Sequence, residues 1–562
     1  MQQAGTDGKV ETTEASGDEG EHTAVAGTPP TAAEASKPEL VIGLVGPIGT
    51  DLHDLAKTIE EKLSAFRYRC EQIKVSTLIA GMCDDDAKAR LDEARGGARI
   101  RMLMAAGDSI RTGAGDGGAL VPLIVTAIRT ARVAFNKDRN VTEDVHADDA
   151  CYIVDSLKHP DEIKALRDLY GRGFVLVSAF DSRDARVAKL QRDIAKSATS
   201  TNVDQYREEA TTLVDIDEKR PGGGIGQYVR DAFPLGDFFI RVREGYDVAL
   251  GRFLDALFGD PYITPYRGEH HMAEASMAAL RSADLSRQIG AVIVDRHGEI
   301  VSSGCNDVPM AGGGTYWPDE PSALDNRDHT TGQDFNAVMK FDIIGQLLAF
   351  LEKEGLYERK VDGDASAVTA ELVTGRYRTG FKELRISNLI EFGRVVHAEM
   401  AALMRAAQRG IAIDRSTIYS TTFPCHMCAR HIIAAGVTRV VYIEPYPKSM
   451  TAELFPESVL VDRKSYATDR PDDGGGKPRP DAGGDRDPVR FDPYEGIAPR
   501  LYTKLFRVES GRKDARGYTV KWRRADARPK TYDRPEIDLK LERQVAAGLE
   551  GIARVGLTAI GV

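Results

Sequence analysis

The sequence lacks the features that disulfide-bonded, membrane-spanning and secreted proteins require. Six cysteines in 562 residues are too few for a disulfide framework, so a reducing compartment is expected. No apolar run approaches the roughly 18–20 residues that span a bilayer. The chain also opens without the basic and apolar segments of a secretory signal. These absences predict a cytoplasmic protein with no membrane partner.

The chain also has fewer basic residues than acidic ones. The chain has 75 Lys and Arg residues against 86 Asp and Glu residues, which gives a formal net charge of −11. Proteins dedicated to nucleic acids use many contacts between basic side chains and phosphates, so this balance disfavours that class, although a local basic patch remains open. The hydrophobic fraction of 42% is ordinary for a globular protein, and the length predicts two to four domains.

The order of elements predicts an α/β protein. Residues 1–37 almost lack large apolar side chains and predict a disordered tail. Strand-like and helix-like segments then alternate over 38–262, which predicts a parallel sheet covered by helices. The expected strands are 40–45, 150–154, 173–178 and 238–242, and the expected helices are 51–66, 162–170 and 183–194.

A second α/β domain is expected over 263–510. Its predicted strands are 290–295, a hairpin partner at 299–303, 416–420 and 439–443, with helices at 272–282, 395–407 and 425–435. Residues 463–490 are rich in Asp, Pro and Gly, and this composition predicts a mobile loop that leaves the domain. Residues 511–562 form a C-terminal extension with one amphipathic helix near 539–552.

The strongest chemical signal is HAE at 397–399, followed by PCHMC at 424–428. The imidazole of His397 and the thiolates of Cys425 and Cys428 suit Zn²⁺, and three protein ligands leave the fourth tetrahedral position for water. Both ligand groups are expected at helix N-termini, where the helix dipole favours anionic sulfur. Glu399, two residues past the histidine, is close to the metal but free to act as a base.

This pattern matches the signature of zinc nucleobase deaminases, in which a glutamate moves protons while water replaces the exocyclic amine. Two alternatives remain open for the cysteine pair. It could be a redox pair, which would not need the upstream His-x-Glu, or half of a structural zinc site. A structural site needs a fourth protein ligand, for which Cys305 and His431 are the candidates.

Residues 263–505 resemble the deoxycytidylate deaminase branch of the cytidine deaminase-like superfamily. The matching segments are SADLSRQIGAVIVD (282–295), SSGCNDVP (302–309), VVHAEMAAL (395–403), TTFPCHMCARHIIAAGV (421–437) and VVYIEPYPKS (440–449). The resemblance implies an α/β/α sandwich and a substrate-binding site. In that site Asn306 contacts the sugar or base, the Ala398 backbone lines the pocket, and Ser286, Arg287 and Gln288 lie near the phosphate.

Three further features narrow the resemblance. The chain has a long insertion between Asn306 and His397, a continuation through 491–506, and the whole N-terminal α/β domain. Together they resemble the bacterial anti-phage dCTP/dCMP deaminases, in which a P-loop kinase-like domain comes first. This resemblance implies deamination of dCTP and dCMP that depletes the dCTP pool, control by a nucleotide, and a homo-oligomer such as a hexamer. Some such relatives are restrained by a small RNA.

Three other functions are weighed against this one. A housekeeping dCMP deaminase that supplies dUMP would use the same chemistry without the added domain. A deaminase of nucleic-acid cytosines is disfavoured by the net charge. A non-catalytic nucleotide sensor is disfavoured because Glu399 stands beside a complete ligand set.

The first expected strand leads into Gly46-Pro-Ile-Gly49-Thr50-Asp51, which is the context of a phosphate-binding loop. The lysine of such loops is missing, and the carboxylate of Asp51 would repel phosphate, which disfavours phosphoryl transfer. A tight turn without ligand and a regulatory nucleotide site at Gly46, Gly49 and Thr50 both remain open. Arg183 and Arg186 could clamp phosphates or face solvent.

Overall fold

The computed structural model describes residues 37–141, 145–219, 228–319, 325–358, 362–446, 448–461, 487–508, 511–530 and 538–548. The expected tail at 1–36 and most of the expected excursion at 463–490 lie outside this range. Lys37, counted with the tail, is buried, and its Nζ donates to the Phe66 carbonyl at 2.7 Å. This contact fixes the point at which the first domain begins.

The first sheet is parallel except at one edge. It contains β1 (Leu40–Val45), β2 (Arg69–Lys74), β3 (Ala150–Leu157), β4 (Phe174–Phe180), β5 (Phe238–Arg241) and β12 (Gly496–Ile497). The strand order is β12-β5-β4-β1-β3-β2, and only β12 is antiparallel. All six residues of β1 are buried, as expected for a strand covered on both faces.

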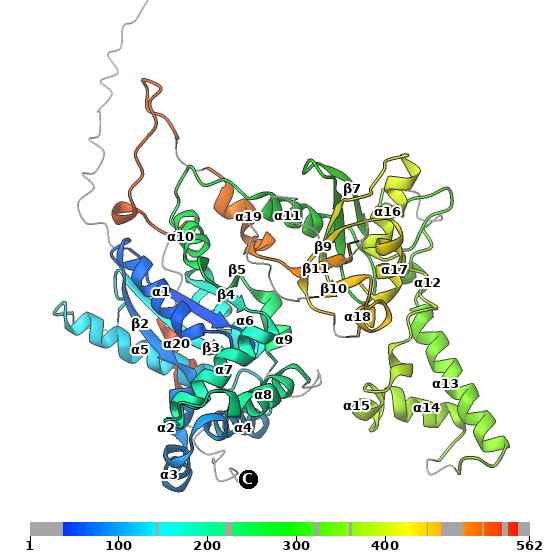
Figure 1. Cartoon of the computed structure of the whole chain (residues 1–562), viewed down its shortest axis with the longest axis horizontal. Coiled ribbons are helices and arrows are strands. Elements are labelled where there is room, and N and C mark those ends of the chain that lie inside the picture. The colour runs from blue at the N-terminus through cyan, green and yellow to red at the C-terminus, as the bar shows by residue number, and fades with distance from the viewer. Residues whose placement is uncertain are drawn as a thin grey trace, which may run out of the picture. The chain divides into compact units, whose positions relative to one another are not determined.

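Helices cover both faces of this sheet (Figure 1). Alternate residues of β1 enter different cores, with Val41 and Val45 in one and Leu40, Ile42 and Leu44 in the other. The expected helices are present as α1 (Leu52–Ser64), α6 (Pro160–Tyr170) and α7 (Arg183–Ser197).

Sequence analysis did not foresee β2 or the helices between β2 and β3. These helices are α2 (Val75–Met82), α3 (Asp85–Glu93), α4 (Gly96–Ala114) and α5 (Val121–Lys137), and α8 (Arg207–Lys219), α9 (Val229–Ala232) and α10 (Tyr246–Leu257) complete the region.

The second sheet is mixed. Its strands are β6 (Gly290–Val294), β7 (Ile300–Cys305), β8 (Thr417–Thr422), β9 (Arg439–Glu444), β10 (Val459–Val461) and β11 (Val489–Pro493). Their order is β10-β11-β9-β8-β6-β7. The hairpin of β6 and β7 is antiparallel, as expected, and β6 is also antiparallel to β8, while the other pairs are parallel.

Helices also pack on both faces of the second sheet. Ala291 and Ile293 of β6 share a core with residues of α16 (Ala398–Gln408) and α17 (His426–Ala434). Val292 and Val294 point the other way, into a core with α11 (Arg267–Ala279). This alternation gives the helix–sheet–helix layering expected of the second domain.

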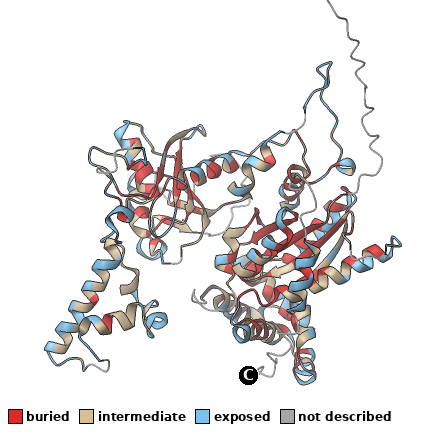
Figure 2. Ribbon diagram, turned by 180° about the vertical axis from the view of Figure 1, so that it is seen from behind, coloured by how far each residue is buried: buried red, intermediate tan, exposed pale blue. Residues whose placement is uncertain are grey.

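The insertion after β7 is helical. Its elements are α12 (Asp328–Thr331), α13 (Phe335–Lys353), α14 (Ala365–Val373) and α15 (Arg378–Phe381). Figure 2 shows little buried surface on α13–α15, and Ile344, Val368 and Thr369 are their buried residues. This part of the chain therefore adds surface to the second domain without a substantial core of its own.

The C-terminal part returns to the first domain. After α18 (Thr451–Leu454) and α19 (Pro499–Phe506), the chain ends its described part in α20 (Leu539–Ala547), which packs against α5. Both β12 and α20 thus complete a region that the sequence assigns to 38–262. Among the described residues, no helix combines the length and apolar character that crossing a bilayer requires.

Candidate metal centre and substrate site

The first expected ligand lies at the start of a helix. Helix α16 begins at Ala398, so His397 is its N-cap residue with extended backbone angles (φ −67°, ψ 154°). The helix therefore starts three residues later than the expected 395. It packs tightly on β7, where a Cβ atom added to Gly304 would lie 2.3 Å from the Ala398 carbonyl oxygen. This close approach fixes the position of His397 relative to the sheet.

The cysteines lie at the start of the neighbouring helix. Cys425 is the N-cap residue of α17, and Cys428 follows in the first turn. The Nδ1 atom of His397 lies 3.2 Å from Sγ of Cys425 and 3.4 Å from Sγ of Cys428. All three donor atoms lie within 4.8 Å of one another. The expected ligands, separated by 28 residues in the sequence, are thus brought together by two helix N-termini.

Among the described residues, no fourth His, Cys, Asp or Glu donor joins this group. His397, Cys425 and Cys428 are the one set of three or more such residues, within the described part of the chain, whose donor atoms converge closely enough to hold a metal ion. Cys305 is buried at the end of β7, and His431 lies in the last turn of α17 with its Nε2 accepting from Arg430 at 3.3 Å. The donor set of one imidazole and two thiolates fits Zn²⁺ with a coordination position left open.

The electrostatics of the three donors favour an anionic sulfur. A hydrogen bond from Cys428 and the nearby imidazole lower the pKa of Cys425 to about 4. The hydrogen bond to Cys425 raises the pKa of His397 to about 9, and the same sulfur raises the pKa of Cys428. One thiol therefore ionises readily, which reduces the cost of binding a cation.

Glu399 is buried beside these donors but is not one of them. Its side chain lies in the first turn of α16, and Oε1 accepts a hydrogen bond from Ser420 Oγ at 3.3 Å. Burial raises the pKa of this carboxyl group, and the neighbouring sulfur of Cys425 raises it further. A carboxyl group with a raised pKa can both accept and donate a proton near neutral pH.

Ser420 is a site residue that sequence analysis missed. It is fully buried in β8, whose other inward-facing residue in this core is Ile418. A polar residue in a buried strand position was the available signal, but a strand pattern does not indicate which helix faces it. The bond to Glu399 orients the carboxyl group without contributing a metal ligand.

Asn306 is buried directly after β7 and braces the loop at 282–289. Its Nδ2 donates to the Arg287 carbonyl at 2.6 Å, and its Oδ1 accepts from the Ile289 N–H at 2.7 Å. Ser282 Oγ also donates to the Asn306 carbonyl at 2.6 Å. In this structure the amide therefore positions the loop that carries the other expected substrate residues.

The three loop residues are exposed and face different partners. Arg287 forms an ion pair with Glu444 at the end of β9, with 2.6 Å between Nη1 and Oε1. Gln288 Nε2 donates to the Ser282 carbonyl at 2.9 Å, and the Ser286 N–H donates to Asp284 Oδ1 at 2.7 Å. Arg287 is thus the one of the three whose side chain reaches the end of strand β9.

The glycine loop of the first domain is filled by the protein's own carboxylates. The Ile48 N–H donates to Asp217 Oδ2 of α8 at 2.9 Å, and the Asp54 N–H donates to Asp51 Oδ1 at 3.1 Å. Lys158, at the end of β3, donates from Nζ to the Gly46 carbonyl at 2.9 Å. A lysine from another part of the chain therefore reaches this loop, which sequence spacing did not reveal.

The glycines of this loop are also required by packing. A Cβ atom added to Gly46 would lie 2.7 Å from the Ala179 carbonyl oxygen. One added to Gly49, whose φ is +86°, would lie 2.6 Å from the carbonyl oxygen of Arg186 in α7. The hydroxyl of Thr50 is buried and has no hydrogen-bond partner among the described residues. These contacts explain the glycines without a ligand, while the Thr50 hydroxyl remains unexplained by the fold.

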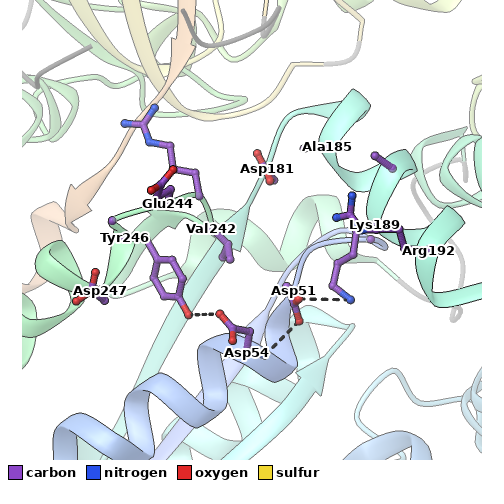
Figure 3. Close-up of a pocket in the computed structure, with 14 residues that line it drawn as sticks. Asp51, Asp54, Asp181, Ala185, Lys189, Arg192, Val242, Glu244, Tyr246 and Asp247 are labelled. Carbon is purple, nitrogen blue, oxygen red and sulfur yellow. Dashed lines mark hydrogen bonds and ion pairs between the residues drawn. The ribbon is translucent and has the colours of Figure 1, made fainter. Parts of the chain in front are cut away.

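A pocket of about 460 Å³ lies beside this loop, at the carboxyl ends of β1, β4 and β5 (Figure 3). Lys189 lies 3.5 Å from Asp51, and Tyr246 Oη donates to Asp54 Oδ2 at 2.7 Å. The acidic lining residues are Asp51, Asp54, Asp181, Glu244 and Asp247, and the basic ones are Lys189, Arg192 and Arg243. The acidic surplus does not favour a bare polyphosphate in this pocket.

Residues 266–444 match the family model of the cytidine and deoxycytidylate deaminase zinc-binding region. The match includes His397, Cys425 and Cys428, and it agrees with the Zn²⁺ that their donor atoms fit. The deoxycytidylate deaminase of Enterobacteria phage T2 is 28% identical over 177 residues, which are 31% of this chain and 78% of that protein. The match to the family model lies within the second domain and does not extend to the first.

Two other similarities are shorter or more distant. ComE operon protein 2 of Bacillus subtilis (strain 168) is 39% identical over 66 residues, so the chain spans 35% of that relative's length and matches with 12% of its own. The crystal structure of dCMP deaminase from the cyanophage S-TIM5 in complex with dCMP and dUMP is 20% identical. That comparison covers 35% of this chain and 94% of the other, with a TM-score of 0.20.

Proposed function

We propose that this protein is a zinc-dependent hydrolase that converts deoxycytidine nucleotides into deoxyuridine nucleotides and ammonia. The observation that carries the proposal is the position of the Glu399 carboxyl group, buried beside the three converging donors of His397, Cys425 and Cys428. A structural zinc site has no need of a buried carboxyl group with a raised pKa beside an open coordination position. A deaminase needs both.

In the proposed reaction, proton transfer and the positioning of the carboxyl group are assigned to different residues of the chain. Zn²⁺, when bound, supplies a Lewis acid that brings the pKa of water towards neutrality. Glu399 takes a proton from the attacking water and delivers protons to the ring nitrogen and to the leaving ammonia. Ser420 holds the carboxyl group in place through its hydrogen bond. Burial of the site keeps the pKa of the Glu399 carboxyl group raised.

The substrate side of the proposal uses the loop at 282–289. Ser286, Arg287 and Gln288 are proposed to lie near the substrate phosphate, Ala398 to line the pocket through its backbone, and Asn306 to contact the sugar or base. Because Asn306 also holds the backbone of Arg287 and Ile289, its loss would disturb the phosphate side as well as the sugar side.

The finer proposal is that dCTP and dCMP are both substrates and that their deamination depletes the dCTP pool in defence against phage. The test offers purified, zinc-loaded protein dCMP, dCTP, CTP and a cytosine-containing single strand, and measures ammonia and uracil products. Turnover of dCTP supports the proposal. Turnover of dCMP alone, inhibited by dTTP, would instead indicate the housekeeping enzyme, and turnover of the strand alone would overturn the free-nucleotide substrate.

A regulatory nucleotide at Gly46, Gly49 and Thr50 forms the second part of the proposal. The buried Thr50 hydroxyl without a partner supports it, whereas Asp217 stands where a phosphate would bind the Ile48 N–H. A bound phosphate must therefore displace Asp217. The test is equilibrium binding of dTTP and ATP to the wild type and to Asp217→Asn, in which tighter binding by the variant is expected. Equal absence of binding in both would leave the loop a structural turn.

A further inference from the structure

Residues 511–530, which we call the basic segment, carry a high local positive charge. They contain eight Lys and Arg residues against two Asp residues, in a chain whose net charge is −11. Both aspartates are already occupied. Asp514 Oδ1 accepts from two backbone N–H groups of its own turn, and Asp526 pairs with Arg523 at 2.7 Å. The segment itself therefore leaves most of its positive charge without compensation.

The basic segment is held on the first domain by specific contacts. It opens as a short hairpin, in which the Val520 N–H donates to the Arg512 carbonyl at 3.0 Å. The phenol oxygen of Tyr262 lies 2.9 Å and 2.7 Å from the carbonyl oxygens of Arg512 and Val520. Further along, Arg524 donates two hydrogen bonds to Asp255 of α10, at 2.7 Å and 2.8 Å. The cations are thus presented by a segment that folding has already ordered.

Four cations of the basic segment are exposed and unpaired. Among the described residues, no carboxylate lies within ion-pair distance of these side chains, which are Lys513, Arg516, Lys521 and Arg528. Like charges on one short segment repel one another, and an acidic partner would convert that repulsion into attraction. The surface therefore fits a partner with several negative charges.

The chain contains an acidic segment of matching charge at its N-terminus. Residues 1–36, which we call the acidic segment, include seven Asp and Glu residues and one Lys residue, and six of the seven acids lie between Asp7 and Glu21. This segment lies outside the described residues. Its formal charge of −6 is equal and opposite to that of the basic segment.

The acidic segment joins the described chain beside the basic segment. Lys37, the first described residue, donates from Nζ to the Ala525 carbonyl of the basic segment at 2.7 Å. The same Nζ donates to the Phe66 carbonyl at 2.7 Å, and Lys37 is buried. The point at which the acidic segment begins is therefore fixed next to the cations.

The length of the acidic segment suffices for its acids to reach the cations. Glu21 and Asp7 are 16 and 30 residues from Lys37. Unstructured chain of that length has a root-mean-square span of about 20–33 Å. Lys513, the far unpaired cation, is 12 residues from Ala525 and so lies at most about 43 Å from it, less in a hairpin. The two segments can therefore meet without any change in the fold.

We propose that the acidic segment docks on the basic segment of the same chain and shields it from other polyanions. Single exposed ion pairs are weak, but the connection through Lys37 makes the contact intramolecular, with an effective concentration in the millimolar range. The inference is independent of the proposed function, because neither segment contains a residue of the metal centre or of the substrate site.

The chain's own acidic segment fits this surface better than two other occupants. A nucleic-acid strand typically has about 6–10 of its phosphates neutralised by a protein, whereas the described part of the basic segment leaves four cations unpaired. The acidic segment of a second copy carries the same charge but has no tether. Below millimolar protein concentration, the tethered segment is therefore the favoured occupant.

The first experiment locates the contact in the full-length protein. A carbodiimide joins carboxylates to amines that touch them, and mass spectrometry is expected to find acids of 7–21 joined to Lys513 or Lys521. The links should disappear in about 0.5 M NaCl, where the Debye length is only about 4 Å. No link between the two segments at low salt would overturn the proposal. In a mixture of isotope-labelled and unlabelled protein, links within one chain support it, and links that join labelled to unlabelled chains alone would assign the surface to a second copy instead.

The second experiment measures the shielding with heparin, a polysulfated probe. Heparin is titrated calorimetrically into the full-length wild type and into the variant Glu14→Gln/Glu19→Gln/Glu21→Gln. Because the acidic segment competes with the probe, the variant is expected to bind heparin about tenfold more tightly. Adding Lys513→Gln/Lys521→Gln to this variant should abolish the gain, and a gain that persists would place the heparin site elsewhere and overturn the proposal.

The matched control neutralises three exposed acids of α3. The variant Asp85→Asn/Asp86→Asn/Glu93→Gln changes the net charge of the chain by the same amount and should bind heparin within about twofold of the wild type. Equal tightening in both triple variants would show that only net charge matters, and no tightening in the variant of the acidic segment would show that nothing shields the cations. Either result would overturn the proposal.

Discussion

Arg132 and Glu542 form a buried ion pair across 410 residues of chain. Nη1 of Arg132 lies 2.5 Å from Oε2 of Glu542, and Nη2 lies 2.9 Å from Oε1. The same guanidinium also donates from Nε to Oε1 of Glu39 at 2.7 Å, and all three side chains are almost fully buried. This network attaches helix α20 to α5 and to the residue that precedes β1.

Replacing Glu542 by Gln is expected to loosen α20. The amide cannot balance the guanidinium charge, and breaking a buried pair costs about 3–5 kcal/mol when one partner is left uncompensated. Glu39 still pairs with Arg132, so a loss near 2–3 kcal/mol in the free energy of unfolding is expected. Chemical denaturation measures the loss, and hydrogen exchange locates it in α20 and α5. Lys540→Gln, exposed on the same helix, is the control, and an equal loss there would contradict the network's role.

The same network predicts a loss of stability in acid. Burial raises the pKa of Glu39, but the hydrogen bond with His146 and the charge of Arg132 outweigh it, so the net pKa lies below the ordinary 4.5. A carboxyl group with a lowered pKa stabilises the fold above its unfolded value and stops doing so as the pH falls through the folded value. The stability difference between wild type and Glu39→Gln is therefore expected to be constant above pH 4.5 and to shrink below it. A difference that grows in acid would refute this assignment.

Glu399→Ala is expected to keep zinc and lose turnover. The carboxyl group is not among the three converging donors, so metal content by mass spectrometry should stay near one ion per chain. General acid–base catalysis typically contributes 10²–10⁴-fold, so ammonia release should fall by at least about a hundredfold. Full activity in this variant would exclude the proposed chemistry, and loss of zinc would indicate that the carboxyl group is a ligand.

Cys425→Ala is expected to lose both zinc and activity. Removing this sulfur leaves an imidazole and one thiol, and it removes the group that ionises most readily in the site. Metal content and ammonia release are measured on the same preparation as for Glu399→Ala. Cys305→Ala serves as the control, because that buried thiol lies outside the donor group. Retained stoichiometric zinc in Cys425→Ala would show that the ligands have been assigned wrongly.

Gly304→Ala is expected to displace helix α16 and with it His397 and Glu399. The new methyl group would lie 2.3 Å from the Ala398 carbonyl oxygen and 2.5 Å from the Ala402 nitrogen, both of them backbone atoms. Overpacking of this kind costs about 1–3 kcal/mol, and the shift should also weaken zinc binding. Thermal unfolding and a zinc competition assay measure the two effects. Gly380→Ala in α15, where no atom lies within 4 Å, should leave both unchanged.

Local pattern was sufficient to predict the donor groups of the second domain. The motifs at 397–399 and 424–428 each lie at the start of a helix, so helix geometry places these donor groups at two N-termini. The resemblance to deaminases relied on the same short segments, and the family model matches the region that contains them. The strands of both sheets were predictable because buried strands are continuous apolar runs. The sequence analysis did not foresee β2, which has one buried residue in six, or the helices that follow it. It also did not foresee the short strands β10, β11 and β12.

The sequence by itself predicted the three donor groups that the structure brings together, the carboxyl group beside them and most of the strands, because short local patterns indicate each of these. The tertiary structure alone decided which residues far apart in the chain meet: Asp217 and the Ile48 N–H, Ser420 and Glu399, and Glu542 and Arg132. Such pairs leave no periodic signal, because each depends on the path of the whole chain between its members. The physical reason is that hydrogen bonds and charges act over a few ångströms in space, whatever the separation in sequence.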